Sequence, residues 1–224
     1  MVVQIYSMTS IADAVATAQA GADLIGVVVA ERGLVPEAIS AETAREIHAA
    51  IRPRSRGIAL SLSDDRDEIC AMVDKVRPDL VHIAAREIDP DDCAWIRTRI
   101  SPVGLLRAIA VRAGETLTEA KAHQDCADYL MLDSGAKGLP FSAVGGETHD
   151  WSICRTVVDQ SRVPIILAGG LSADNVAQAI DVVRPWGVDS FTHTDVAGQR
   201  GKKDLARVRA FIAAALRGFA ATLD

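Results

Sequence analysis

Two short stretches of this sequence carry residues that suit phosphate binding. The first is an apolar run that ends in Gly169 and Gly170. Two glycines let the backbone approach a ligand closely, and the N–H groups at the start of a following helix attract anions. The second stretch, Thr192 and His193, follows another apolar run. We therefore predict a phosphate site at Gly169, Gly170, Thr192 and His193, although the two glycines could instead serve only a tight turn.

A carboxylate, Asp133, closes the apolar run Leu130–Leu132. A carboxylate at the end of a buried strand is partly desolvated, which raises its pKa and suits it to proton transfer. The same residue could instead cap a helix or order a loop. The next segment, Ser134–Thr148, contains four glycines. A connection of this length predicts a mobile lid over the site.

Apolar segments of two kinds must position these residues. Eight are rich in Val, Ile and Leu on both faces, which predicts the strands of a covered parallel sheet: Val2–Tyr6, Leu24–Val29, Gly57–Leu62, Leu80–Ile83, Gly104–Val111, Tyr129–Leu132, Ile165–Ala168 and Val188–Phe191. The segments between them place apolar residues three and four apart, as helices packed on a sheet do: Ile11–Ala20, Ala41–Ile51, Arg66–Val76, Asp91–Ile100, Ser152–Gln160, Ser172–Val183 and Asp204–Leu216.

Eight such alternations in 224 residues predict an eightfold (β/α) TIM barrel that forms a single domain over residues 1–224. In that fold the active residues lie at the carboxyl ends of the strands. An open, doubly wound sheet is the alternative, but no GxGxxG motif follows the first predicted strand.

Four of the predicted strands share a local signature, in which a small or apolar residue and then aspartate come at or before the start of the strand. The aspartates are Asp23, Asp79, Asp128 and Asp189. They recur roughly every 50–60 residues, as expected of a chain built from repeated pairs of βα units.

Composition excludes several classes of function. A net charge of −6 argues against electrostatic binding to nucleic acid or to an anionic membrane. No apolar run approaches the ~18 residues of a membrane span, and the start of the chain lacks the pattern of a signal peptide, so we expect a cytoplasmic protein. The four cysteines lie far apart, without a CxxC pair. We predict neither a metal nor a cofactor, and a monomer or a homodimer.

These segments, in order, resemble the phosphoribosylanthranilate isomerase family, barrels of tryptophan biosynthesis that perform an Amadori rearrangement on a phosphorylated aminosugar. The similarity covers essentially the whole chain and is most specific in Ile166–Leu171 with the later Gly187-Val188-Asp189. Leu132-Asp133 and Asp150-Trp151 also match the family's pattern. The resemblance implies that Asp133 is the acid that protonates the ribose ring oxygen.

The chain also departs from that family. Where the family's first strand ends in Lys-Ile-Cys-Gly, with the cysteine as general base, this chain has Gln4-Ile5-Tyr6-Ser7. Glu37 stands near the position of the family's carboxylate-binding arginine, and Arg32 is the nearby substitute. The family's Gln-Leu-His-Gly in the fourth strand is His82-Ile83-Ala84-Ala85, and its Ser-Ser-Gly after the eighth is Phe191-Thr192-His193.

From this pattern we predict Asp133, Tyr6 and His82 as catalytic and Arg32, Asp189 and Asp195 as substrate-binding. Tyr6 could act as a base only if its pKa fell several units below ~10. His82, His193, Asp189 and Asp195, which we expect at or near the barrel mouth, are alternative bases.

Three functions stay open, because loss of a general base costs ~10²–10⁴ in rate. We favour an isomerase or lyase that acts on a small phosphorylated sugar other than the anthranilate conjugate. The alternatives are a divergent phosphoribosylanthranilate isomerase and a non-catalytic relative that binds a phosphorylated metabolite or a partner protein.

Overall fold

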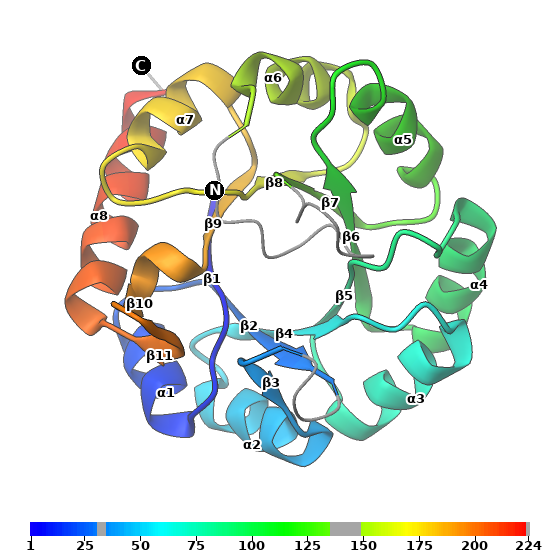
Figure 1. Ribbon diagram of the computed structural model, residues 1–224, viewed down its shortest axis with the longest axis horizontal. Helices are drawn as coiled ribbons and strands as arrows, with labels where there is room; N and C mark the ends of the chain where they lie inside the picture. The colour runs from blue at the N-terminus through cyan, green and yellow to red at the C-terminus, as the bar shows by residue number, and fades with distance from the viewer. Residues whose placement is uncertain (31–34, 135–148, 223–224) are drawn as a thin grey trace.

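Eight parallel strands close a barrel in the computed structural model, which describes residues 1–30, 35–134 and 149–222 (Figure 1). Strand β1 pairs with both β9 and β2, and this double pairing closes the sheet. The predicted TIM barrel is therefore confirmed. Its strands are β1 (Val2–Ile5), β2 (Leu24–Val29), β4 (Arg56–Ser61), β5 (Leu80–Ile83), β6 (Gly104–Ala110), β7 (Tyr129–Asp133), β8 (Ile165–Leu167) and β9 (Gly187–Ser190).

Helices form the outer ring around these strands (Figure 1). They are α1 (Ile11–Gln19), α2 (Ala41–Ile51), α3 (Arg66–Val76), α4 (Pro90–Ile100), α5 (Thr116–His123), α6 (Trp151–Gln160), α7 (Val176–Val183) and α8 (Leu205–Ala221). Most begin at a Ser or Asp side chain that accepts a backbone N–H of the first turn, as Ser10 and Asp204 do. Within the described residues, no helix combines the length and the apolar character that a membrane crossing requires.

Three helices differ clearly from the sequence-based expectation, and one of them, α8, continues to Ala221, beyond the predicted end at Leu216. The helical pattern did not predict α5, because this eight-residue helix buries Thr116, Ala120 and His123 instead of large apolar side chains. Helix α7 begins at Val176 and not at Ser172. The side chain of Asn175 accepts the Ser172 N–H, which folds the preceding residues into a turn.

The segment between β9 and α8 is more regular than predicted. A 3₁₀ turn over Thr192–Thr194 leads into an antiparallel hairpin of β10 (Asp195–Val196) and β11 (Gln199–Lys203). A two-residue strand, β3 (Ala38–Ile39), pairs with the end of β2. These additions all lie next to the carboxyl ends of β1, β2 and β9.

Side chains inside the barrel come from every second position of a strand, because neighbouring residues of a strand point to opposite faces. On β2, for example, Leu24 and Val28 belong to the inner cluster, whereas Ile25 and Val27 pack outwards against the helices. The inner positions are apolar toward the amino ends of most strands. Gln4, His82, Asp133 and Asp189 occupy inner positions and are all buried, so polar groups enter the barrel interior on β1, β5, β7 and β9.

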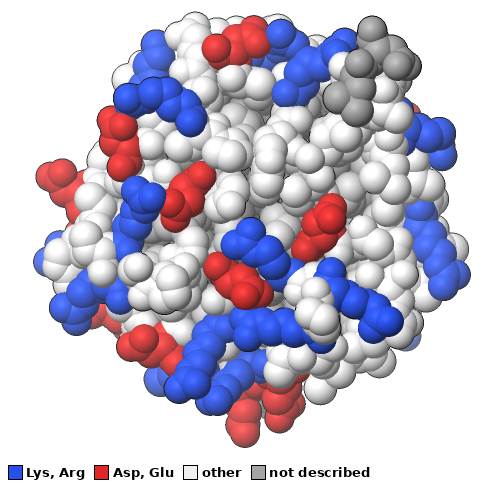
Figure 2. All heavy atoms as spheres, turned by 180° about the vertical axis from the view of Figure 1, so that it is seen from behind, with Lys and Arg blue, Asp and Glu red and all other residues white. Residues whose placement is uncertain are grey.

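At the amino ends of the strands, three of the four repeated aspartates make the same kind of hydrogen bond to the neighbouring strand. Asp23, Asp79 and Asp128 each lie directly before a strand and accept a backbone N–H from the neighbouring strand, over 2.8, 2.7 and 2.9 Å. Acidic and basic side chains are interspersed on this face of the molecule (Figure 2). Asp189 is the exception to the predicted repeat, since it is the third residue of β9 and points into the barrel.

Candidate active site

A pocket of about 510 Å³, including its open mouth, lies at the carboxyl ends of the strands. Its residues come from β2, β4, β5, β7 and β9 and from the connections that follow β1, β8 and β9. This is the end of a TIM barrel at which active sites form. Eight of the ten predicted site residues come together here from distant parts of the chain: Tyr6, His82, Asp133, Gly169, Gly170, Asp189, Thr192 and His193.

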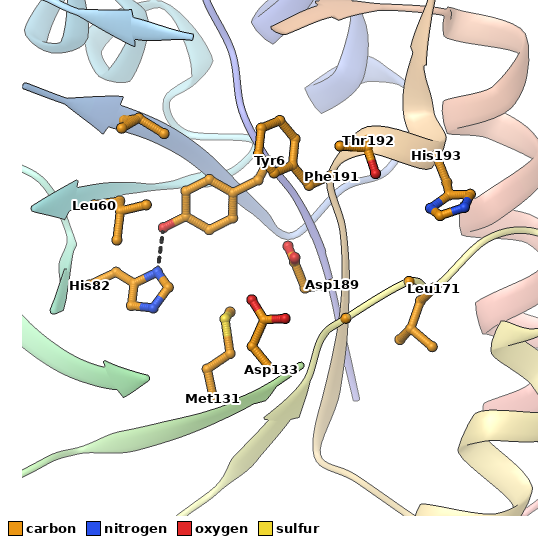
Figure 3. A pocket seen from close by; sticks show the side chains of 13 residues that line it. Tyr6, Leu60, His82, Met131, Asp133, Leu171, Asp189, Phe191, Thr192 and His193 are labelled. Atoms are coloured by element: carbon orange, nitrogen blue, oxygen red, sulfur yellow. Dashed lines mark hydrogen bonds between the residues drawn. The ribbon is translucent and has the colours of Figure 1, made fainter. Parts of the chain in front are cut away.

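Two carboxyl groups occupy the middle of the pocket. Asp133 closes β7 and Asp189 lies on β9, and their side chains approach each other in Figure 3. Burial, and after it the charge of Asp133, raise the pKa of Asp189 to about 8. Gln4, the residue beside Asp189 in the strand register, donates from Nε2 to Oδ1 over 3.0 Å and partly offsets this rise. The pair therefore retains a proton at neutral pH.

The glycine turn after β8 forms one wall of the pocket. Gly169 and Gly170 have φ values of +84° and +64°, in the left-handed region that favours glycine. A side chain at Gly169 would also press against the backbone N of Ser134. Thr192 and His193 line the same side of the pocket, from the 3₁₀ turn after β9. All four predicted phosphate-binding residues thus border one pocket, and phosphate binding there stays a prediction.

Tyr6 and His82 lie at the other side, where the pocket meets the apolar interior of the barrel (Figure 3). The Tyr6 hydroxyl and His82 Nδ1 are 3.0 Å apart. Burial, and secondly the charge of Asp189, raise the pKa of Tyr6 well above its ordinary value. Burial, together with the positive charge of Arg107, lowers the pKa of His82 to about 3. These directions disfavour the predicted role of either residue as a general base, because the phenol keeps its proton and the imidazole binds one weakly.

Asp195 requires a correction. It is buried outside the lining of the pocket, where its carboxylate is ion-paired with Lys203 and accepts the Gly201 N–H over 3.0 Å. Both of its oxygens therefore have partners within the hairpin, and the residue is not part of the pocket lining. Lys203, which the sequence analysis did not single out, also donates to the carbonyls of Tyr6 and Phe191. It holds the end of β1 against the turn after β9, which positions both sides of the pocket.

Glu37, which the sequence resemblance places near a carboxylate-binding position, is fully buried and paired with Arg200 over 2.8 Å. Arg200 lies on β11, and its guanidinium is 5.0 Å from the centre of the Phe191 ring in the pocket wall. Sequence spacing gave no sign of this pair, because 163 residues separate its members. Arg32 and most of the predicted lid, from residue 135 to Thr148, lie outside the described residues.

Gln4, the hydrogen-bond partner of Asp189, is the other residue next to the site that the sequence analysis missed. Its signal was its place two residues before Tyr6, which puts both side chains inside the barrel. In the part of the chain that the structure describes, no group of three His, Cys, Asp or Glu side chains could hold a metal ion.

Comparison with known proteins places this geometry in a family. Residues 3–214 match the family described as N-(5′-phosphoribosyl)anthranilate (PRA) isomerase. Proteins named N-(5′-phosphoribosyl)anthranilate isomerase from Methanocella arvoryzae and Pseudomonas fluorescens are 36% and 35% identical to it. These alignments cover 94% and 93% of this chain, respectively, and 95% of each relative.

Solved structures agree with the sequence comparisons. The phosphoribosyl anthranilate isomerase of Thermotoga maritima superposes with a TM-score of 0.83 at 28% identity, over 97% of this chain and 100% of that one. A phosphoribosyl anthranilate isomerase in complex with reduced 1-(o-carboxyphenylamino)-1-deoxyribulose 5-phosphate gives a TM-score of 0.80 at 27% identity, with the same coverage. This chain belongs to the N-(5′-phosphoribosyl)anthranilate isomerase family.

Proposed function

We propose that this protein catalyses the Amadori rearrangement of a phosphorylated aminosugar, with N-(5′-phosphoribosyl)anthranilate as its first candidate substrate and tryptophan biosynthesis as its pathway. The relatives favour this substrate over the other phosphorylated sugars that the sequence alone suggested, because relatives at 36%, 34% and 37% identity carry the name of this isomerase. The observation that carries the proposal is the neighbouring pair Asp133 and Asp189, which lies in one pocket with the glycine turn.

The substrate phosphate would bind at the glycine turn. Loops after the last two strands of a TIM barrel often bind phosphate, and the turn after β8 and the 3₁₀ turn after β9 are those loops here. Gly169 and Gly170 leave the backbone open to a ligand, and the Thr192 hydroxyl lines the same wall. With the phosphate there, the sugar extends toward the two carboxyl groups.

The carboxyl pair supplies the proton transfers. Two adjacent carboxyl groups that share one proton titrate as a unit, so one of them is an acid at neutral pH while the other is ionised. The pair donates its proton to the ribose ring oxygen as the C1–O bond breaks and the iminium forms. The pair, now doubly ionised, removes the proton from C2, which converts the iminium to the enolamine and returns the carboxyl pair to its singly protonated state. In this scheme Asp133 and Asp189 together replace a separate thiol base.

The test is a turnover assay with N-(5′-phosphoribosyl)anthranilate, in which product formation is followed chromatographically. Asp133→Asn should lower kcat by roughly 10²–10⁴, the usual contribution of a positioned acid or base. Asp128→Asn is a matched control, since Asp128 lies at the other end of the same strand. It should keep most of the activity.

Two results would contradict the proposal. One is the absence of turnover by the wild-type protein with this substrate, together with failure to restore growth of a tryptophan auxotroph. If inorganic phosphate still bound in that case, the non-catalytic alternative would gain support. The other is full activity of Asp133→Asn, which would mean that the carboxyl pair does not transfer the protons.

A further inference from the structure

The side of the pocket away from the glycine turn is apolar apart from one polar pair. Leu60 and Met131 line it together with Tyr6 and His82 (Figure 3). The Tyr6 ring lies directly against the backbone of Gly26 on β2, and a side chain at residue 26 would overlap that ring. Tyr6 is therefore held in a fixed position, with its hydroxyl directed at His82.

The hydrogen bond between them fixes which imidazole nitrogen carries the hydrogen. If Nδ1 donated to Tyr6, the buried phenol hydrogen would need another acceptor, and His82 Nδ1 is the hydrogen-bond partner of that hydroxyl in the described residues. With Nδ1 as donor, both the phenol hydrogen and the Nε2 lone pair lack a partner among the described residues, whereas with Tyr6 as donor only the Nε2–H lacks one. The arrangement with Tyr6 as donor is therefore favoured. The neutral imidazole then carries its hydrogen on Nε2.

That Nε2–H group has no partner of its own among the described residues. His82 is 1% exposed, and Nε2 is fully buried without a hydrogen-bond partner, although the residue lines the pocket. Arg107 is the charged neighbour, but it is at an outward-facing position of β6 and donates to the carbonyls of Ile83 and Ile88. A buried donor without a partner, on a residue that lines a pocket, is best explained by an acceptor on the ligand.

The order of groups across the pocket indicates which part of the ligand carries this hydrogen-bond acceptor. In Figure 3, Leu171, the residue after the glycine turn, is at one side, the two carboxyl groups are in the middle, and the Tyr6–His82 pair is at the other side. With the phosphate at the turn and the sugar at the carboxyl groups, the substituent on the sugar nitrogen reaches this apolar side. Leu60 and Met131 suit a flat apolar ring there.

We propose that His82 Nε2–H donates a hydrogen bond to an oxygen atom on the nitrogen substituent of the substrate, and that Tyr6 is a positioning residue that fixes the tautomer of His82. This inference rests on the proposed function for the direction in which the substrate lies. It reassigns Tyr6 and His82 from proton transfer to recognition, and it predicts a substituent with a carboxylate or carbonyl oxygen.

The test compares two ligands in two proteins. The ligands are reduced 1-(o-carboxyphenylamino)-1-deoxyribulose 5-phosphate, which a solved relative binds, and the same compound without its carboxyl group. Calorimetry gives the ratio of their affinities for the wild type and for His82→Phe. A hydrogen bond to a charged oxygen accounts for roughly tenfold or more, so the ratio should fall by about that factor in the variant.

Three variants serve as controls. Met131→Leu changes the same wall without removing a hydrogen bond and should leave the ratio within about twofold. His82→Gln keeps a donor and should recover part of the ratio. Tyr6→Phe should lower the ratio less than His82→Phe does. Without the Tyr6 hydroxyl, His82 populates both neutral tautomers, and only the Nε2–H tautomer can donate to the ligand. Nitrogen-15 NMR of the wild type should show the His82 hydrogen on Nε2, and the Tyr6→Phe spectrum should show a mixture.

The inference is overturned if the affinity ratio is the same in the wild type and in His82→Phe. It is also overturned if the wild type carries the His82 hydrogen on Nδ1, or if it binds neither ligand. Failure of the proposed function looks different, since it is a lack of turnover. A protein that shows the His82-dependent ratio without turnover would keep this inference and lose the catalytic proposal, and the reverse pattern would do the opposite.

Discussion

Strand β7 has an aspartate at each end, and the two aspartates meet opposite surroundings. Asp128, just before the strand, accepts the Leu105 N–H and pairs with the half-exposed Arg97. Asp133, the last residue of the strand, is buried beside Asp189. At the amino end, donors and a cation compensate the charge, whereas at the carboxyl end a second carboxyl group competes for ionisation.

The comparison extends to the other strands. Asp23 and Asp79 repeat the arrangement of Asp128, each with a backbone N–H as donor. Asp189 shares their sequence signature but has a pKa of about 8 because it is buried inside the barrel next to Asp133. The same residue type thus stabilises one end of the barrel and gives the other end a group that can exchange protons near neutral pH.

The largest difference between the two ends should appear in activity. Asp189→Asn removes one member of the carboxyl pair and should lower kcat by roughly 10²–10⁴. Asp79→Asn, which changes an aspartate at the other end, should lower kcat less than about threefold once the fraction of folded protein is taken into account. Steady-state assays of both variants at pH 7 test this. Equal losses would mean that the two ends do not differ in role.

The pH dependence of stability should also separate the two ends. Below about pH 4, Asp189 is protonated in both the folded and the unfolded chain. Between about pH 4 and 8 the unfolded chain releases this proton while the folded protein keeps it, because the folded pKa is about 8 and the ordinary value is 3.8. Rising pH therefore favours unfolding in this window, by up to about 1.4 kcal/mol per pH unit, and the loss levels off above pH 8.

Asp189→Asn removes this contribution and can still accept the hydrogen bond from Gln4. The free energy of unfolding of the variant, measured with urea, should exceed that of the wild type by a margin that grows from pH 4 to pH 8. All other titrating groups are common to both proteins, so the difference reports the titration of Asp189 and its coupling to Asp133. A margin that stays constant with pH would contradict the raised pKa.

A smaller effect is expected from the amino end. Asp128→Ala leaves the Leu105 N–H without its acceptor and Arg97 without its partner. A lost partner of a partly buried donor costs about 1–3 kcal/mol of folding free energy. Denaturant titration should show that loss, while kcat well below the melting temperature stays the same. A large fall in kcat without loss of stability would reverse the assignment of the two ends.

The smallest change in stability is expected from an exposed ion pair at the amino end. The ion pair of Arg52 with Asp79 joins side chains that are 48% and 26% exposed. Exposed pairs contribute about 0–1 kcal/mol, so Arg52→Ala should change the free energy of unfolding by no more than that. Asp79 would keep its hydrogen bond from the Gly57 N–H. A loss above 2 kcal/mol would show that the arginine, and not the backbone donor, is the main partner.

The sequence predicts the barrel because the strands are local and strongly apolar. It also predicts Gly169 and Gly170 at the pocket, since adjacent glycines after a strand mark a place where the backbone needs left-handed φ values. Asp133 follows from its place at the end of an apolar strand. These features depend on a few neighbouring residues and on the rule that active residues follow the strands.

Partners from distant parts of the chain could not be predicted. Gln4 and Asp189 are 185 residues apart and meet only because β1 and β9 close the barrel. Asp195 was predicted to bind substrate because nothing near it in sequence showed that Lys203 turns back and pairs with it across the hairpin. The repeat around Asp189 was misleading for the same reason, since the direction of a side chain depends on where its strand begins.

The protonation state of Asp189 is the most direct test of this account. Carbon-13 NMR of the aspartate side-chain carboxyl groups can follow each titration from pH 4 to pH 9, with Asp189→Asn to assign the signal. We expect the Asp189 carboxyl to titrate near pH 8, as burial beside Asp133 requires. Midpoints below pH 5 for both Asp133 and Asp189 would contradict the account, because the pair would then hold no proton to donate at neutral pH.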